Sequence, residues 1–296
     1  MKTWNRLAVC LVLGSVATHG GDGLSLAAPP TIASAPLLEG IFNLPDFQRC
    51  LVLVNESGSS PFSHVLPKGQ RVGNVEVITI NPAEGRVEFM LWPGMRSLVL
   101  EITNSPPVGI AFQKAGLVSV LELYGRVKGR SILHPFLGDS RTLTLRAPAK
   151  TKLEAVEAIE AALKREGLAV VPDGTKFVLV VPQTQAASAV PSSSFIKASD
   201  ENAKQPEILP QGSVCFRNSE TMQAVQVYAS VVGRKLENPD RTPRIANPGI
   251  VFLNQTPLTL EEVRYALDTL FAWQGFEMVE VGEKGIKVVL KVGPQH

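Results

Sequence analysis

The chain has 296 residues, 45% of them hydrophobic, which is enough to fill the cores of two or three small domains. Its 29 Lys and Arg residues against 27 Asp and Glu residues leave a formal charge of only +2, so no strong electrostatic attraction to nucleic acid or anionic lipid is encoded. The composition indicates a globular protein whose partners are recognised by shape rather than by net charge.

Residues 1–28 have the layout of a secretory signal peptide. Lys2 and Arg6 precede an apolar run over 7–17, and small residues follow it. The run is shorter than the about 20 apolar residues that cross a bilayer, so the pattern favours a cleaved signal over an uncleaved anchor. We therefore expect an exported chain, periplasmic in a bacterium, that associates with the envelope only through its partners.

Removal of this signal leaves two cysteines, Cys50 and Cys215, in a compartment where disulfides persist. One interpretation is a disulfide between these distant parts of the chain. Each cysteine also lies in an apolar, strand-like run, where a buried thiol behaves as a small hydrophobic side chain. The sequence favours the second interpretation and keeps the Cys50–Cys215 disulfide as the alternative.

Short alternating runs over residues 37–102, separated by turn residues, predict a small antiparallel β-sandwich or barrel. We expect the strands over 72–80 and 86–92 to leave an open edge, and a strand of another protein pairs readily with such an edge. Tryptophan is also enriched at binding hot spots. The candidate partner-binding residues on these strands are Val75, Val77 and Trp92.

Residues 151–167, TKLEAVEAIEAALKREG, and 259–275, TLEEVRYALDTLFAWQG, predict two capped amphipathic helices. Each begins with Thr, has Glu three residues later as in a capping box, and ends on a Gly that closes the last turn. Apolar residues at helical spacing predict one buried stripe on each helix. The stripes are Leu153, Val156, Ile159 and Leu163 on the first helix, and Val263, Leu267, Leu270 and Phe271 on the second.

The two helices belong to a longer repeat, because the second helix starts 108 residues after the first and three upstream features recur 104 residues apart. These features are Phe112, Tyr124 and Gly129-Arg130, matched by Phe216, Tyr228 and Gly233-Arg234. Each copy reads as strand, helix, strand, helix, strand, strand, over 110–182 and 213–292. Residues 183–212 are rich in Ser, Ala, Gln and Pro and have no apolar period, which predicts a flexible linker. The predicted fold is α+β and multidomain, with the β-sandwich or barrel followed by two βαβαββ modules.

The run from LVSVLELYGRVKGRSIL through TKLEAVEAIEAALKREGLAVVPDGTKFVLVVP resembles the periplasmic N-terminal domains of secretins, the outer-membrane channels of type II secretion and type IV pilus systems. The shared pattern is an apolar helix ending in Gly-Arg or Gly-Lys, a short strand, a Thr- or Ser-started helix with Glu-Ala, and a strand ending in V-x-x-V. The resemblance covers 110–182 and, more weakly, 213–292.

The turn Lys68-Gly69-Gln70, the strand VEVITI and the run GRVEFMLWPG resemble the homology-region domain of the inner-membrane clamp protein of type II secretion, and of the corresponding pilus lipoprotein. In those systems this domain binds the first N-terminal domain of the secretin. The resemblance therefore implies a secretin or an inner-membrane secretion platform protein as partner, and it leaves homo-oligomerisation open.

No motif of a known catalytic or cofactor site is present. The four His residues share no local ligand spacing with Cys, Asp or Glu, and the chain contains no P-loop, nucleophile elbow or dinucleotide-binding fingerprint. The basic residues around 150–165 alternate with Glu, which is typical of a solvated helix face rather than a nucleic-acid site. We expect no catalytic residue, no metal, no cofactor and no nucleic-acid partner.

The sequence thus predicts a non-enzymatic periplasmic interaction or scaffold protein, an accessory of a type II secretion or type IV pilus system that docks on a secretin channel. The alternative is a periplasmic ligand-binding or signalling module of the kind found as the sensor domain of outer-membrane receptors. Co-purification with a secretin distinguishes the two.

Overall fold

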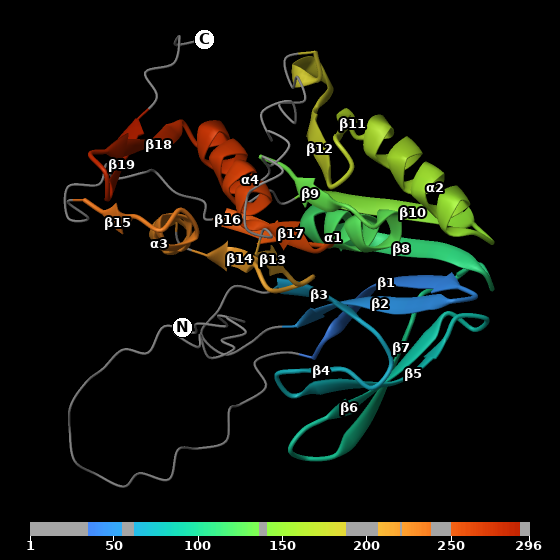
Figure 1. Cartoon of the computed structure of the whole chain (residues 1–296). Coiled ribbons are helices and arrows are strands. Elements are labelled where there is room, and N and C mark those ends of the chain that lie inside the picture. Colours follow the sequence, from blue (N-terminus) through green and yellow to red (C-terminus); the bar gives the residue numbers. More distant parts are fainter. Residues whose placement is uncertain are drawn as a thin grey trace, which may run out of the picture. The chain divides into compact units, whose positions relative to one another are not determined.

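The computed structural model describes residues 35–54, 62–135, 141–187, 207–219, 221–237 and 250–290 (Figure 1). The described chain contains four helices and several sheets in which antiparallel pairing predominates, so the α+β class is confirmed. The predicted signal peptide and most of the predicted linker lie outside the described residues.

The elements have the following bounds. The helices are α1 (Leu117–Lys128), α2 (Lys152–Arg165), α3 (Thr221–Val231) and α4 (Leu260–Trp273). The strands up to the first helix are β1 (Leu37–Leu44), β2 (Phe47–Val54), β3 (Phe62–Leu66), β4 (Arg71–Val72), β5 (Val75–Asn81), β6 (Arg86–Leu91), β7 (Arg96–Glu101) and β8 (Gly109–Gly116). The later strands are β9 (Ser131–Leu133), β10 (Thr142–Pro148), β11 (Leu168–Asp173), β12 (Phe177–Pro182), β13 (Ile208–Leu209), β14 (Cys215–Ser219), β15 (Lys235–Leu236), β16 (Ile250–Leu253), β17 (Leu258–Thr259), β18 (Phe276–Val281) and β19 (Gly285–Leu290).

The described chain packs as two compact units. The N-terminal unit consists of the described residues of 35–128 and 141–163. The C-terminal unit consists of the described residues of 129–135 and 164–290. The first predicted module, 110–182, is therefore divided between the two units.

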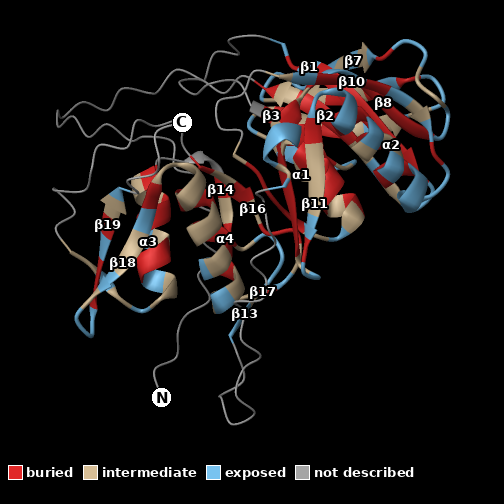
Figure 2. Ribbon diagram, turned by 90° about the horizontal axis from the view of Figure 1, so that it is seen from above, coloured by how far each residue is buried: buried red, intermediate tan, exposed pale blue. Residues whose placement is uncertain are grey.

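The N-terminal unit has a five-stranded sheet, ordered β10-β8-β1-β2-β3, and a four-stranded sheet, ordered β4-β5-β6-β7. Apolar residues that alternate along these strands form one core, which runs from Leu38 and Ile41 through Val77 and Phe89 to Ala111. The sequence predicted a domain boundary between the β-rich segment 37–102 and the first module 110–182. The structure has one sheet across this boundary, because β1 pairs directly with β8. Figure 2 shows buried residues along β1, β2 and β8 of the five-stranded sheet.

The C-terminal unit has a three-stranded sheet β11-β12-β9, a three-stranded sheet β15-β19-β18 and two two-stranded sheets, β14-β16 and β13-β17. One hydrophobic core contains residues of both predicted modules, since Phe177 and Leu179 of β12 cluster with Phe252 and Leu267 of the second copy. The expected boundary at residue 182 therefore does not separate two cores.

The two copies have the same strand pairings. In the first, β8 pairs antiparallel with β10, β9 pairs parallel with β12, and β11 pairs antiparallel with β12. In the second, β14, β15, β16, β18 and β19 repeat this pattern as β14–β16, β15–β19 and β18–β19. The sequence prediction missed one short strand in each copy, β9 in the first and β15 in the second. Each follows the first helix of its copy and has too few residues to give a periodic signal.

Both capped helices form where the sequence predicts them. Thr259 accepts a hydrogen bond from the Glu262 backbone and Glu262 bonds back to the Thr259 backbone, which completes a capping box. At α2, Thr151 caps the Glu154 backbone, but the Glu154 carboxylate reaches the Lys150 backbone instead.

One member of the predicted helix stripes is wrong. Leu153 is 67% exposed, although Val156, Ile159 and Leu163 are buried as expected. Leu153 lies in the first turn of α2, and the buried residues of this helix begin at Ala155. All four predicted residues of the α4 stripe are buried.

Candidate interaction surface

Two of the three predicted partner-binding residues belong to the core. Val75 and Val77 are 2% and 0% exposed, and they pair across the sheet with Leu91 and Phe89. Val75 and Val77 lie on either side of the polar Glu76, and the apolar face of such an alternating strand is the one that packs against the core. The prediction that Val75 and Val77 contact a partner is therefore wrong.

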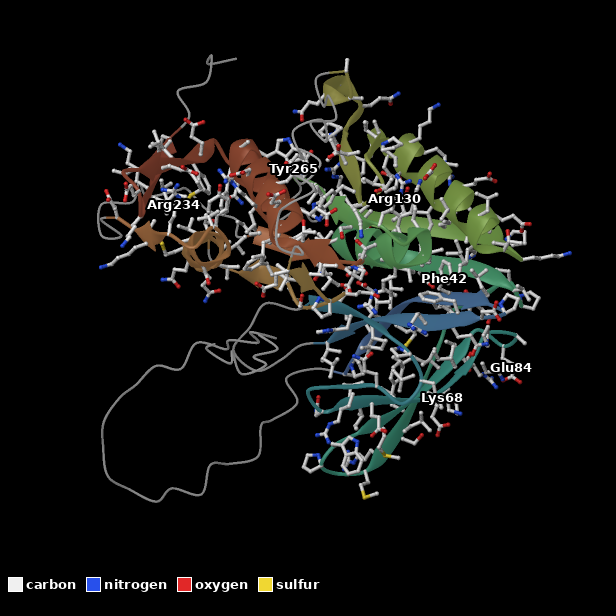
Figure 3. All side chains as sticks on the ribbon, in the orientation of Figure 1. Phe42, Lys68, Glu84, Arg130, Arg234 and Tyr265 are labelled. Atoms are coloured by element: carbon white, nitrogen blue, oxygen red, sulfur yellow. The ribbon has the colours of Figure 1, made fainter. Side chains whose placement is uncertain are left out.

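The open edge also lies elsewhere in this sheet. β5 pairs with β4 and β6, and β6 pairs with β5 and β7. The turn at Lys68, labelled in Figure 3, closes β5 further, because Gly69 N donates to Val77 O at 2.7 Å and Val77 N donates to Gln70 O at 3.0 Å. The edge strands of the described sheet are β4, which has two residues, and β7.

Trp92, the third predicted residue, is half-buried at the end of β6 and is held from three sides. Its backbone N–H donates to Asn74 O at 2.8 Å, and its indole Nε1–H donates to Glu76 Oε2 at 3.0 Å. The guanidinium carbon of Arg71 lies 5.1 Å from the centre of the indole ring, a cation–π distance. We call Arg71, Glu76 and Trp92 the Trp92 cluster.

The Trp92 indole is amphipathic, and its orientation is set by the hydrogen bond to Glu76 and the contact with Arg71. The peptide bond between Trp92 and Pro93 is cis, and Met95, three residues after Trp92, is 65% exposed with a φ of 49°. An indole whose N–H is already satisfied presents mainly apolar area to a partner, and fixing its rotamer in advance reduces the entropy lost on binding. The sequence singled out Trp92, but Arg71 and Glu76 were missed because their contacts arise from strand pairing.

Polar pairs cover part of the outer face of this sheet. Ser97 Oγ donates to Glu88 at 2.8 Å, and Arg86 bonds Glu101 at 2.5 Å and Glu84 at 3.0 Å. These ion pairs are half-exposed, and such pairs contribute little to stability. They leave the Trp92 cluster as the concentrated aromatic feature of this face.

Both described cysteines are thiols in the structure. Cys50 is buried in β2, and burial raises the pKa of its thiol to about 12. Cys215 begins β14 and is partly exposed. A Cys50–Cys215 disulfide stays an untested prediction.

A buried carboxylate in the N-terminal unit is the first arrangement that resembles a reactive site. Ser63 Oγ donates to Glu39 Oε2 at 2.6 Å, and Ser119 Oγ donates to the Ser63 carbonyl at 3.2 Å. Burial is the largest influence on Glu39 and raises the pKa of its carboxyl, against the hydrogen bonds from Ser63 and the Gly116 backbone. The register of β1 is irregular between Leu38 and Gly40, where Glu39 lies. Because Ser63 already donates its hydroxyl hydrogen to Glu39, we interpret the pair as a structural contact that holds the buried carboxyl group.

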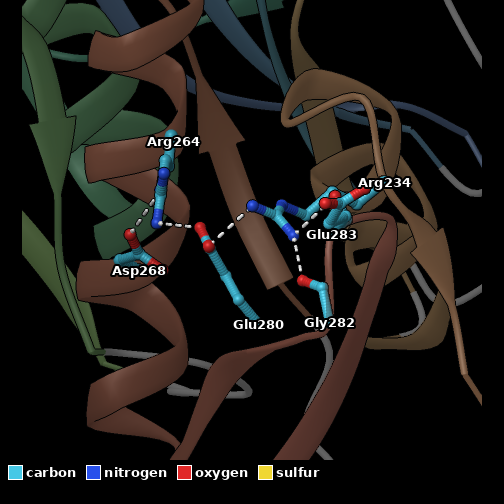
Figure 4. A network of polar contacts seen from close by, with 6 residues as sticks. All are labelled: Arg234, Arg264, Asp268, Glu280, Gly282 and Glu283. Carbon is cyan, nitrogen blue, oxygen red and sulfur yellow. Dashed lines mark hydrogen bonds and ion pairs between the residues drawn. The ribbon is translucent and has the colours of Figure 1, made fainter.

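A polar network in the C-terminal unit joins α4 to the β18–β19 hairpin (Figure 4). Arg234 donates to Glu280 at 2.7 Å and to the carbonyls of Gly282 and Glu283 at 3.1 Å. Arg264 contacts the other Glu280 oxygen at 3.5 Å. This network holds the hairpin turn, and its oxygens are engaged by arginines rather than directed at an open site.

The first copy contains the same turn contact. Arg130 donates to the carbonyl of Gly174, the residue that matches Gly282, at 3.2 Å (Figure 3). The two tyrosines also keep equivalent acidic partners, since Tyr124 OH donates to Glu160 at 2.5 Å and Tyr228 bonds Asp268. Burial, followed by the charge of Asp268, raises the pKa of Tyr228. The recurring Gly-Arg and Tyr positions are therefore structural contacts of the repeat.

Polar contacts also join the two copies inside the C-terminal unit. Gln255 N donates to Ser131 Oγ at 3.0 Å and Lys176 Nζ donates to Pro257 O at 2.9 Å. Tyr265 OH bonds Asp173, whose second oxygen is buried without a hydrogen-bond partner in the described chain. These contacts hold the β11–β12 hairpin of the first copy against the second copy.

The described residues contain no group of three or more His, Cys, Asp or Glu side chains arranged to hold a metal ion. Among these residues no helix is both long and apolar enough to pass through a bilayer. In comparisons with protein-family models, curated proteins and solved structures, no match to the chain is found.

Proposed function

We propose that this protein is a non-enzymatic interaction protein of the bacterial periplasm that docks on a secretin channel as an accessory of a type II secretion or type IV pilus system. The observation that carries the proposal is the repeated arrangement of strands and helices in segments 109–182 and 215–290. This arrangement supports two βαβαββ-type modules of the kind that the sequence resemblance implies, each with one additional short strand.

The details that recur in both copies of the repeat favour a binding role over a chemical one. The residues that recur in both copies cap helices, close hairpin turns or satisfy a buried tyrosine. Residues retained for such contacts maintain a shape, and a repeated shape provides two similar surfaces for docking to a symmetric assembly. This supports recognition by shape, in agreement with the near-neutral charge of the chain.

The Trp92 cluster is the surface at which we place the docking contact. It combines an aromatic anchor with an arginine, the two residue types most enriched in binding hot spots. The exposed Met95 extends the apolar area at the same turn. The polar pairs around Glu88 and Arg86 then form a polar rim that stays accessible to water.

Site-specific photo-crosslinking in the native cell envelope tests the proposal. A photoreactive amino acid replaces Met95 beside the Trp92 cluster, and in a matched control it replaces Leu153, which is 67% exposed on α2. We expect a covalent adduct with a secretin, or with an inner-membrane secretion platform protein, from position 95 and a much weaker adduct from position 153.

Two results would contradict the proposal. The first is a well-folded bait that captures neither a secretin nor a platform protein at either position. The second is equal capture from both positions, which would indicate proximity without docking at the Trp92 cluster. A small-molecule ligand recovered with the purified protein, with no secretin adduct, would support the ligand-binding or signalling alternative.

A further inference from the structure

The edge strand β7 lacks the features that normally prevent edge strands from pairing. Natural edge strands are protected by inward charges, prolines, bulges or shortness. Among the described edge strands of at least six residues, β10 contains Arg146, β11 contains Pro172, and β18 contains Glu277 and Glu280. The interior of β7, residues 97–100, is Ser-Leu-Val-Leu and contains no charge and no proline.

The side chains of β7 are exposed or partly exposed, as expected for a strand that has a neighbour on one side only. No residue of β7 is buried, and Val99 is 51% exposed on the outer face. On the inner face, Leu98 and Leu100 pack against the core of the N-terminal unit but stay partly exposed. An additional strand beside β7 would cover these side chains and pair the backbone groups that face away from β6.

We propose that β7 pairs antiparallel with β7 of a second copy of this chain, so that the two four-stranded sheets join into one across a twofold axis at Val99. Opposite residues of an antiparallel pair lie on the same face. With Val99 on the axis, Val99 meets Val99, Leu98 meets Leu100, and Ser97 meets Glu101. The pairs within residues 97–101 are compatible, because apolar side chains meet on both faces and the small Ser97 leaves room for the Glu101 carboxylate. Arg96 lies opposite residue 102, one position beyond the end of the strand.

The neighbouring registers that keep the faces aligned are less complementary. With Leu98 on the axis, Arg96 lies opposite Leu100 and Ser97 lies opposite Val99. With Leu100 on the axis, Val99 lies opposite Glu101. This strand is thus complementary to itself in one register, which is the requirement for an isologous dimer and selects a second copy as the occupant of the edge.

Sedimentation equilibrium of the full chain with a matched pair of substitutions tests this pairing. Val99→Lys places two ammonium groups opposite each other at the axis, and we expect it to raise the dimer dissociation constant at least about tenfold. Thr79→Lys adds the same charge in the same row of the sheet, opposite Glu88 and two strands from the edge. We expect this control to change the constant less than about twofold, with both variants showing the circular dichroism of the parent.

A cross-linking pair tests the register. In a Cys10→Ser, Cys215→Ser background with Cys50 buried, Val99→Cys should form an intermolecular disulfide under mild oxidation. Ser97→Cys should not, because the two Ser97 positions are offset by about 13 Å along the strands, beyond the about 7 Å limit for Cα separation in a disulfide. A monomeric parent, a Val99→Lys variant that dimerises unchanged, or equal linking at both positions would each overturn the proposal.

Discussion

The two copies of the repeated segment share their strand pairings but differ in what surrounds them. In the first copy, β8 lies between β10 and β1 within a five-stranded sheet. In the second, β14 pairs only with β16 among the described strands. The order of helices and strands is therefore the same in each copy, while the described sheet is larger in the first copy because β8 has the additional neighbour β1.

The residues of β8 and β1 show how the larger sheet is built. β8 begins with four consecutive buried residues, Gly109–Phe112, a pattern typical of a strand covered on both faces. Gly40 of β1 lies directly opposite Phe112, and the absence of a Cβ at Gly40 allows the Phe112 ring to lie there. The pairing of β8 with β1 therefore depends on the small residue Gly40 opposite Phe112.

The largest expected effect tests whether the first copy shares a core with the second. Phe177 is buried on β12 with its ring 5.4 Å from that of Tyr265. We expect Phe177→Ala to lower the free energy of unfolding by about 3–5 kcal/mol and to accelerate amide exchange in α4 and β16 as well as in β11 and β12. The exposed Leu153→Ala is the control, with an expected change below about 0.5 kcal/mol. Faster exchange confined to β11 and β12 would mean that the two copies have separate cores.

A second substitution tests the junction that makes the first copy different. A Cβ at residue 40 would lie 2.7 Å from Phe112 Cδ1, closer than carbon atoms approach. We expect Gly40→Ala to destabilise the protein by about 1–3 kcal/mol, measured by urea denaturation. Gly69→Ala, where no atom lies within 4 Å of the added carbon but φ is +79°, separates steric overlap from backbone strain. A neutral Gly40→Ala would show that β1 and β8 do not pack as closely as described.

The helix caps compare the two copies directly. Thr151 and Thr259 each accept a hydrogen bond from the backbone of the Glu three residues later. We expect Thr151→Ala and Thr259→Ala to cost about 1 kcal/mol each in the free energy of unfolding, measured by chemical denaturation. The matching serine variants keep the hydroxyl and should restore most of the loss. A cost in one copy only would indicate that the equivalence of the caps is superficial.

The buried acid Glu39, on the strand that pairs with β8, predicts a pH effect on stability. Because the folded-state pKa of Glu39 is raised, the folded state holds this proton more tightly than the unfolded state. The stability contributed by this group is present at low pH and is lost as pH rises through the range between the unfolded and folded pKa values. Glu39→Gln should therefore be more stable than the parent at pH 8, by a margin that shrinks towards pH 4, in thermal melts. A margin independent of pH would contradict the raised pKa.

The two cysteines give the smallest effect, a difference in reactivity rather than stability. Cys50 lies in the first sheet with its thiol pKa raised to about 12 by burial, whereas Cys215 is partly exposed on β14. We expect a thiol reagent at pH 8 to leave Cys50 unmodified in the native protein and to modify it after denaturation. Resistance of both thiols without reductant, lost after reduction, would instead support the disulfide alternative.

Local signals in the sequence predicted the local structure well. Thr259 and Glu262 mark the start of α4, and Gly167 and Gly275 end their helices in the left-handed conformation. The predicted burial of Leu153 was wrong, because helical spacing identifies the apolar stripe but does not show whether another element packs against the first turn of the helix. The three-residue β9 and two-residue β15 are too short for any periodicity to mark them.

Long-range pairing was the part that the sequence did not predict. The open edge was expected at β5 and β6, but each of these strands is paired on both sides, because β4 and β7 complete the sheet. The pairing of β1 with β8 joins residues about seventy positions apart and leaves no local signal. Of the candidate site, the sequence identified Trp92 itself, while Arg71 and Glu76 reach it only through the β4–β5–β6 pairing.

The most direct test of the proposed function is calorimetric binding of the purified full chain to the purified periplasmic N-terminal region of the secretin from the same organism. The account predicts saturable binding that Trp92→Ala weakens by at least about 2 kcal/mol, roughly 30-fold in the dissociation constant, and that Leu153→Ala leaves unchanged. No binding by a chain that retains its native circular dichroism, or binding that Trp92→Ala does not alter, would contradict docking through the Trp92 cluster.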